Sequence, residues 1–261
     1  MVKPKVFKAL TVAGSDPSGG AGIQADLKTF TNFEVYGCAA ITALTAQNTR
    51  GVGGIFPVEP DFIRRQVEMV LDDLGPMPVK TGMLADGKAV EAVIDCIDRF
   101  RLGQVVVDPV MVATSQDSLV LEDTRDALRR LIGKALLVTP NLEEARALTG
   151  KDVHDAEGMR EAALEIHRWG VKNILIKGGH LTDDATDLFF DGSEFTLLTE
   201  KRIPGGETHG TGCSYSAAIT SGLAKGMTLL DAVINGKIFI TRALKFALEV
   251  GGGARVLNFF I

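Results

Sequence analysis

The sequence contains little cysteine and no excess of positive charge. Of its 261 residues three are Cys, and 28 Lys and Arg stand against 33 Asp and Glu, for a formal net charge of -5. Cys38, Cys96 and Cys213 are too few and too scattered for a disulfide framework, and nothing near them has the spacing of paired metal ligands. No Lys/Arg cluster resembles a nucleic-acid-binding surface. We therefore expect a protein of the reducing cytoplasm that does not bind nucleic acid.

Long apolar segments are missing as well. No stretch approaches the length that spans a membrane, and the opening segment MVKPKVFKALTVAGSD passes from a short apolar run into a polar turn, unlike a signal peptide. The content of 46% hydrophobic and 23% charged residues is typical of a globular protein with a large core. No Pro/Ser-rich or highly charged linker divides the chain. We expect one domain over residues 1–261 and no membrane partner.

Short apolar segments of strand character alternate with amphipathic segments of helical character. Because the apolar runs are continuous, they suit a parallel sheet that is covered by helices on both faces. Helices are predicted from about Gly22, from about Glu59, over 213–225 and over 229–250, with left-handed C-terminal caps at Gly150 and Gly170. Asp-Gly between two apolar runs at 186–199 predicts an antiparallel hairpin at one edge of the sheet.

Polar residues follow four of the predicted strands directly. In an open parallel sheet, ligands bind beyond the carboxyl ends of the strands, so these residues should meet at one edge. They are Gly14, Ser15 and Asp16, then Asp108, then Asn141 and Glu144, and finally Lys177, Gly178 and Gly179. Carboxylates, an amide, an ammonium group and bare backbone are what a nucleotide, Mg²⁺ and a phosphate acceptor require.

The most specific local signal is the glycine-rich segment before the predicted helix at 213–225. Gly210, Thr211 and Gly212 allow close backbone approach, and the free amides and dipole of the following helix would stabilise a transferring phosphoryl group. This predicts an anion hole. A P-loop kinase is disfavoured because the sequence has no GxxxxGK[ST] motif.

Cys213 is a candidate base or substrate-activating group, since a helix N-terminus should lower the pKa of its thiol. Each candidate also has a simpler interpretation. Cys213 could be a small packing residue, Asp108 a turn former, Asn141 only a helix N-cap and Lys177 a solvated charge.

Seven segments together resemble the hydroxymethylpyrimidine and phosphomethylpyrimidine kinases of thiamine biosynthesis, a branch of the ribokinase-like family. They cover residues 13–30, 41–49, 80–84, 106–111, 139–145, 177–180 and 209–218. The resemblance implies a ribokinase-like three-layer α/β/α sandwich with a mostly parallel central sheet and an antiparallel hairpin toward one edge. It also implies ATP and Mg²⁺ as cofactors, two successive phosphorylations, of the alcohol and then of its monophosphate, and a homodimer.

The same resemblance implies roles for individual residues. The aminopyrimidine site would comprise Gln47, Gly14, Asp16, Met83 and Val110. The catalytic set would be Cys213, Lys177 and Asp26 with the anion hole of Gly210, Thr211 and Gly212. The nucleotide would contact Asn141, Glu144, Thr208 and His209, and the metal would contact Asp108 and Glu144.

The chain departs from this family at two places. Ala113, Thr114, Ser115 and Gln116 stand where AKSG is usual, and GGGARVLNF from Gly251 replaces GKGxGPVNH. Cys213 stands where sugar kinases of the superfamily carry aspartate, which points to the pyrimidine and pyridoxal branch. Two alternatives stay open, a pyridoxal or pyridoxine kinase and a nucleotide- or pyrimidine-binding sensor without catalysis.

Overall fold

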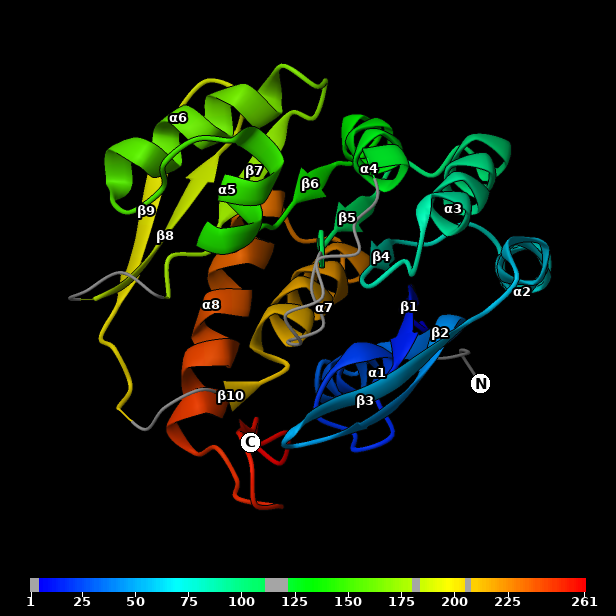
Figure 1. Cartoon of the computed structure of the whole chain (residues 1–261), viewed down its shortest axis with the longest axis horizontal. Coiled ribbons are helices and arrows are strands. Elements are labelled where there is room, and N and C mark those ends of the chain that lie inside the picture. The colour runs from blue at the N-terminus through cyan, green and yellow to red at the C-terminus, as the bar shows by residue number, and fades with distance from the viewer. Residues whose placement is uncertain (1–4, 111–121, 180–183, 205–207) are drawn as a thin grey trace.

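A central nine-stranded sheet organises the computed structural model, which describes residues 5–110, 122–179, 184–204 and 208–261 (Figure 1). The strand order is β3-β2-β1-β4-β5-β6-β7-β8-β9, and all pairings from β2 to β7 are parallel. A separate parallel pair, β10 with β11, lies outside this sheet. The strands are β1 (Lys8–Ser15), β2 (Tyr36–Asn48), β3 (Gly51–Pro57), β4 (Val79–Thr81), β5 (Val105–Val107), β6 (Leu137–Val138), β7 (Asn173–Ile176), β8 (Ala185–Phe190), β9 (Phe195–Glu200), β10 (Thr208–His209) and β11 (Arg255–Val256).

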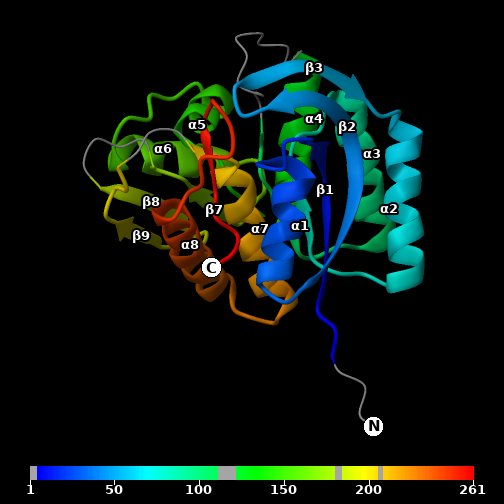
Figure 2. The same cartoon turned by 90° about the horizontal axis from the view of Figure 1, so that it is seen from below.

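Helices cover both faces of the sheet, as Figures 1 and 2 show. One layer contains α2 to α6 and the other contains α1, α7 and α8. The helices are α1 (Gly22–Asn32), α2 (Pro60–Leu74), α3 (Gly87–Phe100), α4 (Glu122–Gly133), α5 (Leu142–Thr149), α6 (Ala156–His167), α7 (Thr211–Ala224) and α8 (Leu229–Lys245). The predicted three-layer sandwich with a mostly parallel sheet is confirmed.

Side chains along the short central strands point alternately to the two faces of the sheet, so each strand contributes to the core on both faces. Val105 and Val107 of β5 belong to the apolar cluster under α2 to α6, whereas Val106 between them packs with Tyr215 and Ile219 of α7. All three valines are fully buried. Because both faces are covered, these strands are continuous apolar runs in the sequence.

Antiparallel pairing closes the sheet at both edges. The predicted hairpin is confirmed, with β8 and β9 joined across Asp191 and Gly192 at one edge. The opposite edge is a second hairpin, β2 with β3, which the sequence did not predict. Most of β3 is exposed to solvent, and three of its seven residues are glycine. It therefore lacks the period-two apolar pattern by which half-buried strands are found.

The predicted helix ends are close to the observed ones, with two corrections. Helix α1 begins at Gly22, Glu59 is the N-cap of α2, and Gly150 is a left-handed cap, as predicted. The last helix, α8, ends at Lys245 rather than at 250. Gly170 has a positive φ of 103° but is not a helix cap, because α6 already ends at the right-handed Arg168.

The C-terminal tail binds the tip of the β2–β3 hairpin. The amide of Ala254 donates to the carbonyl of Thr49 at 2.8 Å, and β11 pairs with β10 through Thr208–Arg255 and His209–Val256. A side chain at Gly253 would overlap the Thr49 backbone, so this approach requires glycine. Among the described helices, none has the length and apolar character needed to cross a bilayer.

Candidate active site

The candidate site lies where the strand order reverses. From β1 the chain connects to β2 on one side, and β4 and β5 continue the sheet on the other. Such a reversal opens a crevice at the carboxyl ends of the strands, where ligands bind in open α/β sheets. Asp16 follows β1, Met83 follows β4, Asp108 follows β5 and Lys177 follows β7. The predicted convergence of the strand ends is confirmed for Asp108 and Lys177, which touch.

Lys177 is held between two carboxylates. Its Nζ lies 2.8 Å from Oδ1 of Asp108 and 4.0 Å from Oε2 of Glu144. Asp108 also accepts hydrogen bonds from Thr139 at 3.2 Å and Ser216 at 3.3 Å. Burial alone would raise the pKa of Asp108, but Lys177 holds it below its ordinary value. Burial raises the pKa of Glu144 to about 7, although Lys177 opposes the shift.

The start of α7 faces this charge cluster. A Cβ added at Gly212 would lie 3.0 Å from Nζ of Lys177 and 3.8 Å from Oδ2 of Asp108. The first hydrogen bond of the helix runs from the Ser214 amide to the Gly210 carbonyl. The amides of 211–213 therefore have no acceptor within the helix. The helix begins two residues before the predicted start, so Thr211 and Gly212 belong to its first turn.

Gly210 is the residue that lets α7 start here. Its φ of 82° is left-handed, and a side chain would overlap the carbonyl oxygen of Gly20 in the loop before α1. Only glycine combines this backbone conformation with so close a contact. The first turns of α1 and α7 are consequently packed against each other.

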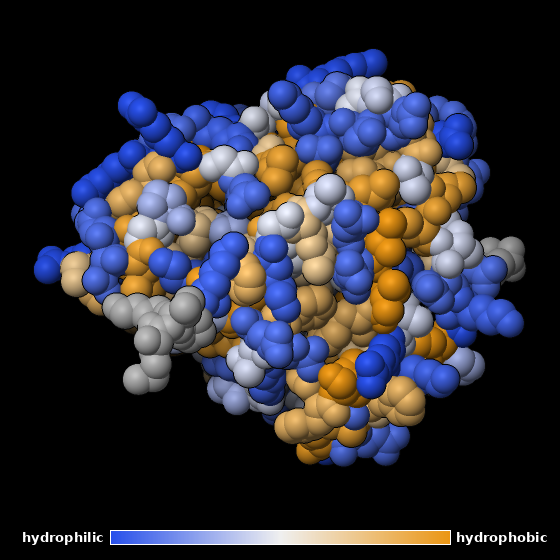
Figure 3. Space-filling model, turned by 180° about the vertical axis from the view of Figure 1, so that it is seen from behind, coloured by the Kyte–Doolittle hydropathy of each residue, from blue (hydrophilic) through white to orange (hydrophobic). Residues whose placement is uncertain are grey.

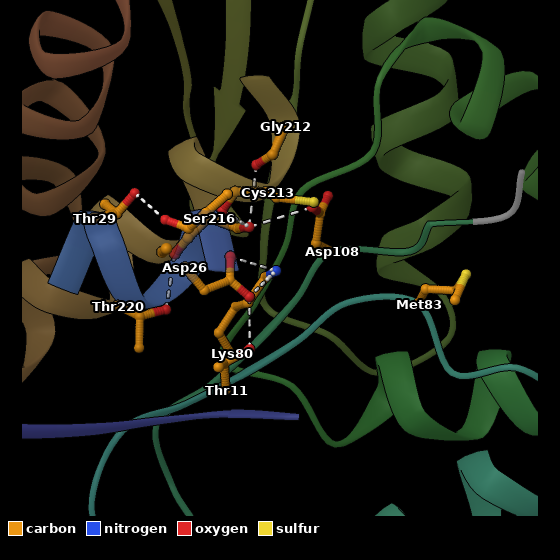
Figure 4. A network of polar contacts seen from close by, with 12 residues as sticks. Thr11, Asp26, Thr29, Lys80, Met83, Asp108, Gly212, Cys213, Ser216 and Thr220 are labelled. Carbon is orange, nitrogen blue, oxygen red and sulfur yellow. Dashed lines mark hydrogen bonds and ion pairs between the residues drawn. The ribbon is translucent and has the colours of Figure 1, made fainter. Parts of the chain in front are cut away.

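Cys213 carries a protonated thiol at neutral pH, which corrects the sequence-based expectation. Burial raises its pKa to about 11, Lys80 opposes the shift, and the nearby Asp108 and Asp26 add to it. The helix N-terminus was expected to lower this pKa, but removal of the thiol from water and two carboxylates outweigh that effect. Figure 4 shows Cys213 among these groups.

Asp26 is enclosed beneath the site rather than exposed in it. Its Oδ2 lies 2.7 Å from Nζ of Lys80, and both side chains have no solvent exposure. The hydroxyl of Thr11 donates to the same oxygen at 2.6 Å. Lys80 was not predicted as a site residue, although a lysine inside the short apolar strand VKT was a usable signal, since buried lysines are almost always paired.

Two of the residues predicted for the aminopyrimidine, Gln47 and Asp16, meet on the β1–β2 side of the site. Nε2 of His209 is 2.8 Å from Nε2 of Gln47 and 3.1 Å from Oδ2 of Asp16. His209, predicted to contact the nucleotide, thus lies with the residues predicted for the acceptor. Met83 packs on Gly14, where it leaves no room for a side chain.

Asp16 has little capacity left for a ligand. Its two oxygens accept from the amides of Ser18, Gly20 and Ala21, from the Ser18 hydroxyl and from His209. Burial alone would raise the pKa of Asp16, but these hydrogen bonds hold it well below the ordinary range. The carboxylate therefore builds the loop between β1 and α1.

Other predicted residues have different surroundings. Asn141 and Glu144 form a capping box at the start of α5, so the simpler N-cap role of Asn141 is confirmed. The hydroxyl of Thr208 is buried without a hydrogen-bond partner. Val110 and Asp108 line a cavity of about 30 Å³. The altered segment at Ala113, Thr114, Ser115 and Gln116 lies outside the described residues.

Metal binding is compatible with the carboxylates present. Within the part of the chain that the structure describes, no group of three or more His, Cys, Asp or Glu side chains could hold a metal. Asp108 and Glu144 nevertheless both lie within 4.0 Å of the same ammonium group. Two hard oxygen donors close together are the kind of protein ligands that Mg²⁺ takes when phosphates and waters supply the rest.

Known proteins match this chain over nearly its whole length. The family described as phosphomethylpyrimidine kinase matches residues 16–258. This chain belongs to that family. The hydroxymethylpyrimidine/phosphomethylpyrimidine kinase of Bacillus subtilis is 42% identical, over 98% of this chain and 95% of its own length. The thiamine biosynthesis bifunctional protein ThiED of Geobacter sulfurreducens is 47% identical over 95% of this chain, which spans 51% of that protein.

Solved structures confirm the ribokinase-like fold of this phosphomethylpyrimidine kinase family member. An ADP complex of Bacillus subtilis pyridoxal kinase superposes with a TM-score of 0.92 at 38% identity and 98% coverage of both chains. The family and these relatives establish that the chain is a kinase, and the bound ADP in the relative supports the predicted use of ATP.

Proposed function

We propose that this chain uses ATP to phosphorylate 4-amino-5-hydroxymethyl-2-methylpyrimidine and then its monophosphate, in the synthesis of thiamine diphosphate. The observation that carries the proposal is the position of Gly212 at the start of α7, directly over Lys177 and Asp108. A helix start with free amides beside a lysine can stabilise a transferring phosphoryl group. The names of the full-length relatives support the choice of acceptor.

During transfer, the acceptor oxygen would bond to the γ-phosphorus as the bond to ADP breaks. Charge on the equatorial phosphoryl oxygens would meet the amides of 211–213 and the ammonium group of Lys177. Asp108 and Glu144 would hold Mg²⁺, which would neutralise phosphate charge when bound. Loose transition states need little proton abstraction early in transfer, so Sγ of a protonated Cys213 can accept a hydrogen bond from the acceptor hydroxyl instead of removing its proton. The hydroxyl proton would leave to solvent or to a phosphoryl oxygen as the O–P bond completes.

The acceptor ring would lie on the β1–β2 side. Gln47 can both donate and accept hydrogen bonds, which suits an aminopyrimidine edge, and its amide nitrogen lies 2.8 Å from Nε2 of His209. Gly14, Met83 and Val110 would supply the surrounding surface, and Asn141 and Thr208 would contact the nucleotide. Asp26 would act from below through Lys80.

A turnover assay tests the proposal directly. Purified protein with Mg-ATP and the pyrimidine alcohol should yield ADP and, in sequence, the monophosphate and the diphosphate, separated by chromatography. Lys177→Ala should be slow in both steps. If protein that binds ATP forms neither phosphate, the proposed function is wrong. Tight binding of ATP or the pyrimidine without turnover would favour a nucleotide- or pyrimidine-binding sensor.

A pyridoxal kinase is the second candidate, because a pyridoxal kinase is among the solved relatives of high similarity. Both acceptors present a hydroxymethyl group on a six-membered nitrogen ring. The ratio of kcat/KM on the two alcohols decides between them, and a ratio above about 10² for the pyrimidine would correspond to nearly 3 kcal/mol of discrimination.

We also propose that the chain acts as one domain, in the cytoplasm, as a homodimer and without nucleic acid. Free Cys38, Cys96 and Cys213 suit a reducing compartment. Apolar side chains reach the surface of the face in Figure 3. Exposed large apolar residues include Phe56, at 70% exposure, and Phe260, at 91%. Such side chains could be covered by a second copy, and sedimentation velocity measures this.

A further inference from the structure

Among the described residues, three buried ion pairs lie on one face of the sheet, and the proposed function uses only two of them. Beside Lys80–Asp26 and Lys177–Asp108, Nζ of Lys237 on α8 lies 2.8 Å from Oδ2 of Asp187 on β8. The side chain of Asp187 is 3% exposed and that of Lys237 is 10% exposed. The third pair is outside the phosphoryl-transfer site, so its purpose requires a separate explanation.

The other oxygen of Asp187 reaches the active-site turn. Oδ1 accepts a hydrogen bond of 2.9 Å from the amide of Gly178, the residue that follows Lys177. Lys237 meanwhile donates to the Ala185 carbonyl at 2.9 Å. The carboxylate is thus fixed on one side by helix α8 and fixes the turn on the other.

The turn has further backbone anchors, and the two described residues that follow Lys177 are glycines. The amide of Lys177 donates to the Pro140 carbonyl at 2.8 Å, and Arg202 donates to the Gly179 carbonyl at 2.8 Å. Gly178 is buried and Gly179 is exposed. Since glycine supplies no packing contacts, hydrogen bonds to the backbone determine where the turn lies.

Stability alone is a poor reason for such a pair. A buried ion pair can often be replaced by apolar residues of similar volume at no cost to folding, because desolvation of both charges offsets their attraction. A charge-assisted hydrogen bond to a backbone amide is, however, short and directional. The arrangement is therefore suited to fixing position.

We propose that Asp187, held by Lys237, is a positioning residue for phosphoryl transfer that acts through the Gly178 amide to set the location of Lys177. The inference rests on the proposed role of Lys177. A misplacement of a catalytic group by about 1 Å can cost on the order of 10²-fold in rate.

Two paired substitutions separate the acceptor atom from the charge. Asp187→Asn with Lys237→Gln keeps an oxygen that can accept from Gly178 and keeps the pair complementary without charge. Asp187→Leu with Lys237→Met removes the acceptor and fills the space with apolar atoms. We expect kcat within about threefold of the parent for the first pair and a loss of roughly 10–100-fold for the second, with little change in the KM of the acceptor.

Lys177→Ala completes the experiment. If Asp187 acts through Lys177, adding the Leu/Met pair to Lys177→Ala should cause no further loss of kcat, whereas independent effects would multiply. Asp191→Asn is the matched control, because Asp191 on the same hairpin accepts from the local Ser193 and Glu194 amides and the Ser193 hydroxyl, all within its own turn. It should keep the parental kcat.

Circular dichroism and thermal unfolding establish that each variant is folded. If the Leu/Met pair does not fold, Asp187→Ala with Lys237→Gln removes the acceptor by truncation and takes its place. The inference is wrong if the Leu/Met pair keeps the parental kcat, or if the Asn/Gln pair loses as much kcat as the Leu/Met pair. Either result leaves the proposed role of Lys177 intact. A parental kcat in Lys177→Ala overturns the role of Lys177 and this inference with it.

Discussion

Lys80 and Asp26 form an ion pair of 2.7 Å in which neither side chain is exposed to solvent. Because the two charges neutralise each other, removal of one partner leaves an unpaired charge in the interior. We expect Lys80→Met to lower the free energy of unfolding by about 3–5 kcal/mol, and Asp26→Leu with Lys80→Met to recover most of it. Denaturant titration measures both.

A surface pair is the control for this prediction. Arg64 and Asp95 lie 2.9 Å apart, with 32% and 57% of their side chains exposed. Arg64→Met should cost less than about 1 kcal/mol. A similar cost in Lys80→Met would mean that water reaches the interior pair.

Cys213 is expected to remain a protonated thiol at neutral pH. Its pKa of about 11 lies above the ordinary value of 9.0, so the thiol stays protonated until the pH rises well past 9. In a protein with Cys38→Ala and Cys96→Ala, alkylation by iodoacetamide should be slow at pH 8 and accelerate toward pH 11, because only the thiolate reacts. Rapid alkylation at pH 8 would show instead that Cys213 is a thiolate that can act as a base.

Kinetics of Cys213 variants give an independent readout. Cys213→Ala should reduce kcat far more than substrate affinity, since the hydrogen bond that the acceptor hydroxyl donates to Sγ strengthens as the hydroxyl oxygen attacks. Cys213→Ser keeps a neutral acceptor at this position and should retain more activity than the alanine variant. Equal small losses in kcat and affinity would reduce Cys213 to a packing residue.

The raised pKa of Glu144 predicts that the use of ATP depends on pH. With a pKa of about 7, against an ordinary 4.5, its carboxylate is ionised above pH 7 and protonated below it in the free protein. Metal-nucleotide binding needs the ionised form, so kcat/KM for Mg-ATP should fall as the pH drops from 8 to 6. Glu144→Gln should lower the plateau and remove this slope, while Glu143→Gln, at the exposed neighbour, should keep it.

Gln47 predicts a selective effect on the acceptor. Gln47→Ala should raise the KM of the pyrimidine about tenfold or more and leave the KM of ATP unchanged, because its carboxamide lies on the β1–β2 side beside His209. Asn48→Ala is the control, since the side chain of Asn48 accepts from the Arg50 amide within the β2–β3 turn. Equal changes in both KM values would contradict the placement of the acceptor there.

Glycine at the start of α7 gives the last prediction. Gly210→Ala should lower kcat by at least about 10²-fold, since a side chain would push α7 away from the Gly20 carbonyl. Gly226→Ala is matched, with a φ of 84° but no atom within 4 Å of an added Cβ. It should cost about 1–2 kcal/mol in stability and leave kcat unchanged.

The sequence predicted those features that depend on local pattern. Continuous apolar runs placed the central strands, Asp-Gly placed the β8–β9 turn, and polar residues after the runs placed Asp108 beside Lys177. Strand β3 escaped because an exposed, glycine-rich edge has no apolar periodicity.

Features that depend on contacts between distant segments were not predictable from the residues alone. Burial and the charges of Lys80, Asp108 and Asp26, which come from three other segments, set the pKa of the Cys213 thiol, so the local helix dipole gave the wrong direction. The partner of Asp26 lies 54 residues away. No spacing rule reports such a pair.

The tail that follows α8 packs against residues of the proposed acceptor site. Glycine at 251–253 lets it pass over Thr49, and Val256 pairs with His209, whose ring contacts Gln47. Truncation after Val250, or a fusion partner pressed against this segment, would therefore loosen the residues proposed to bind the acceptor ring. Changes to this segment are therefore expected to alter recognition of the proposed acceptor.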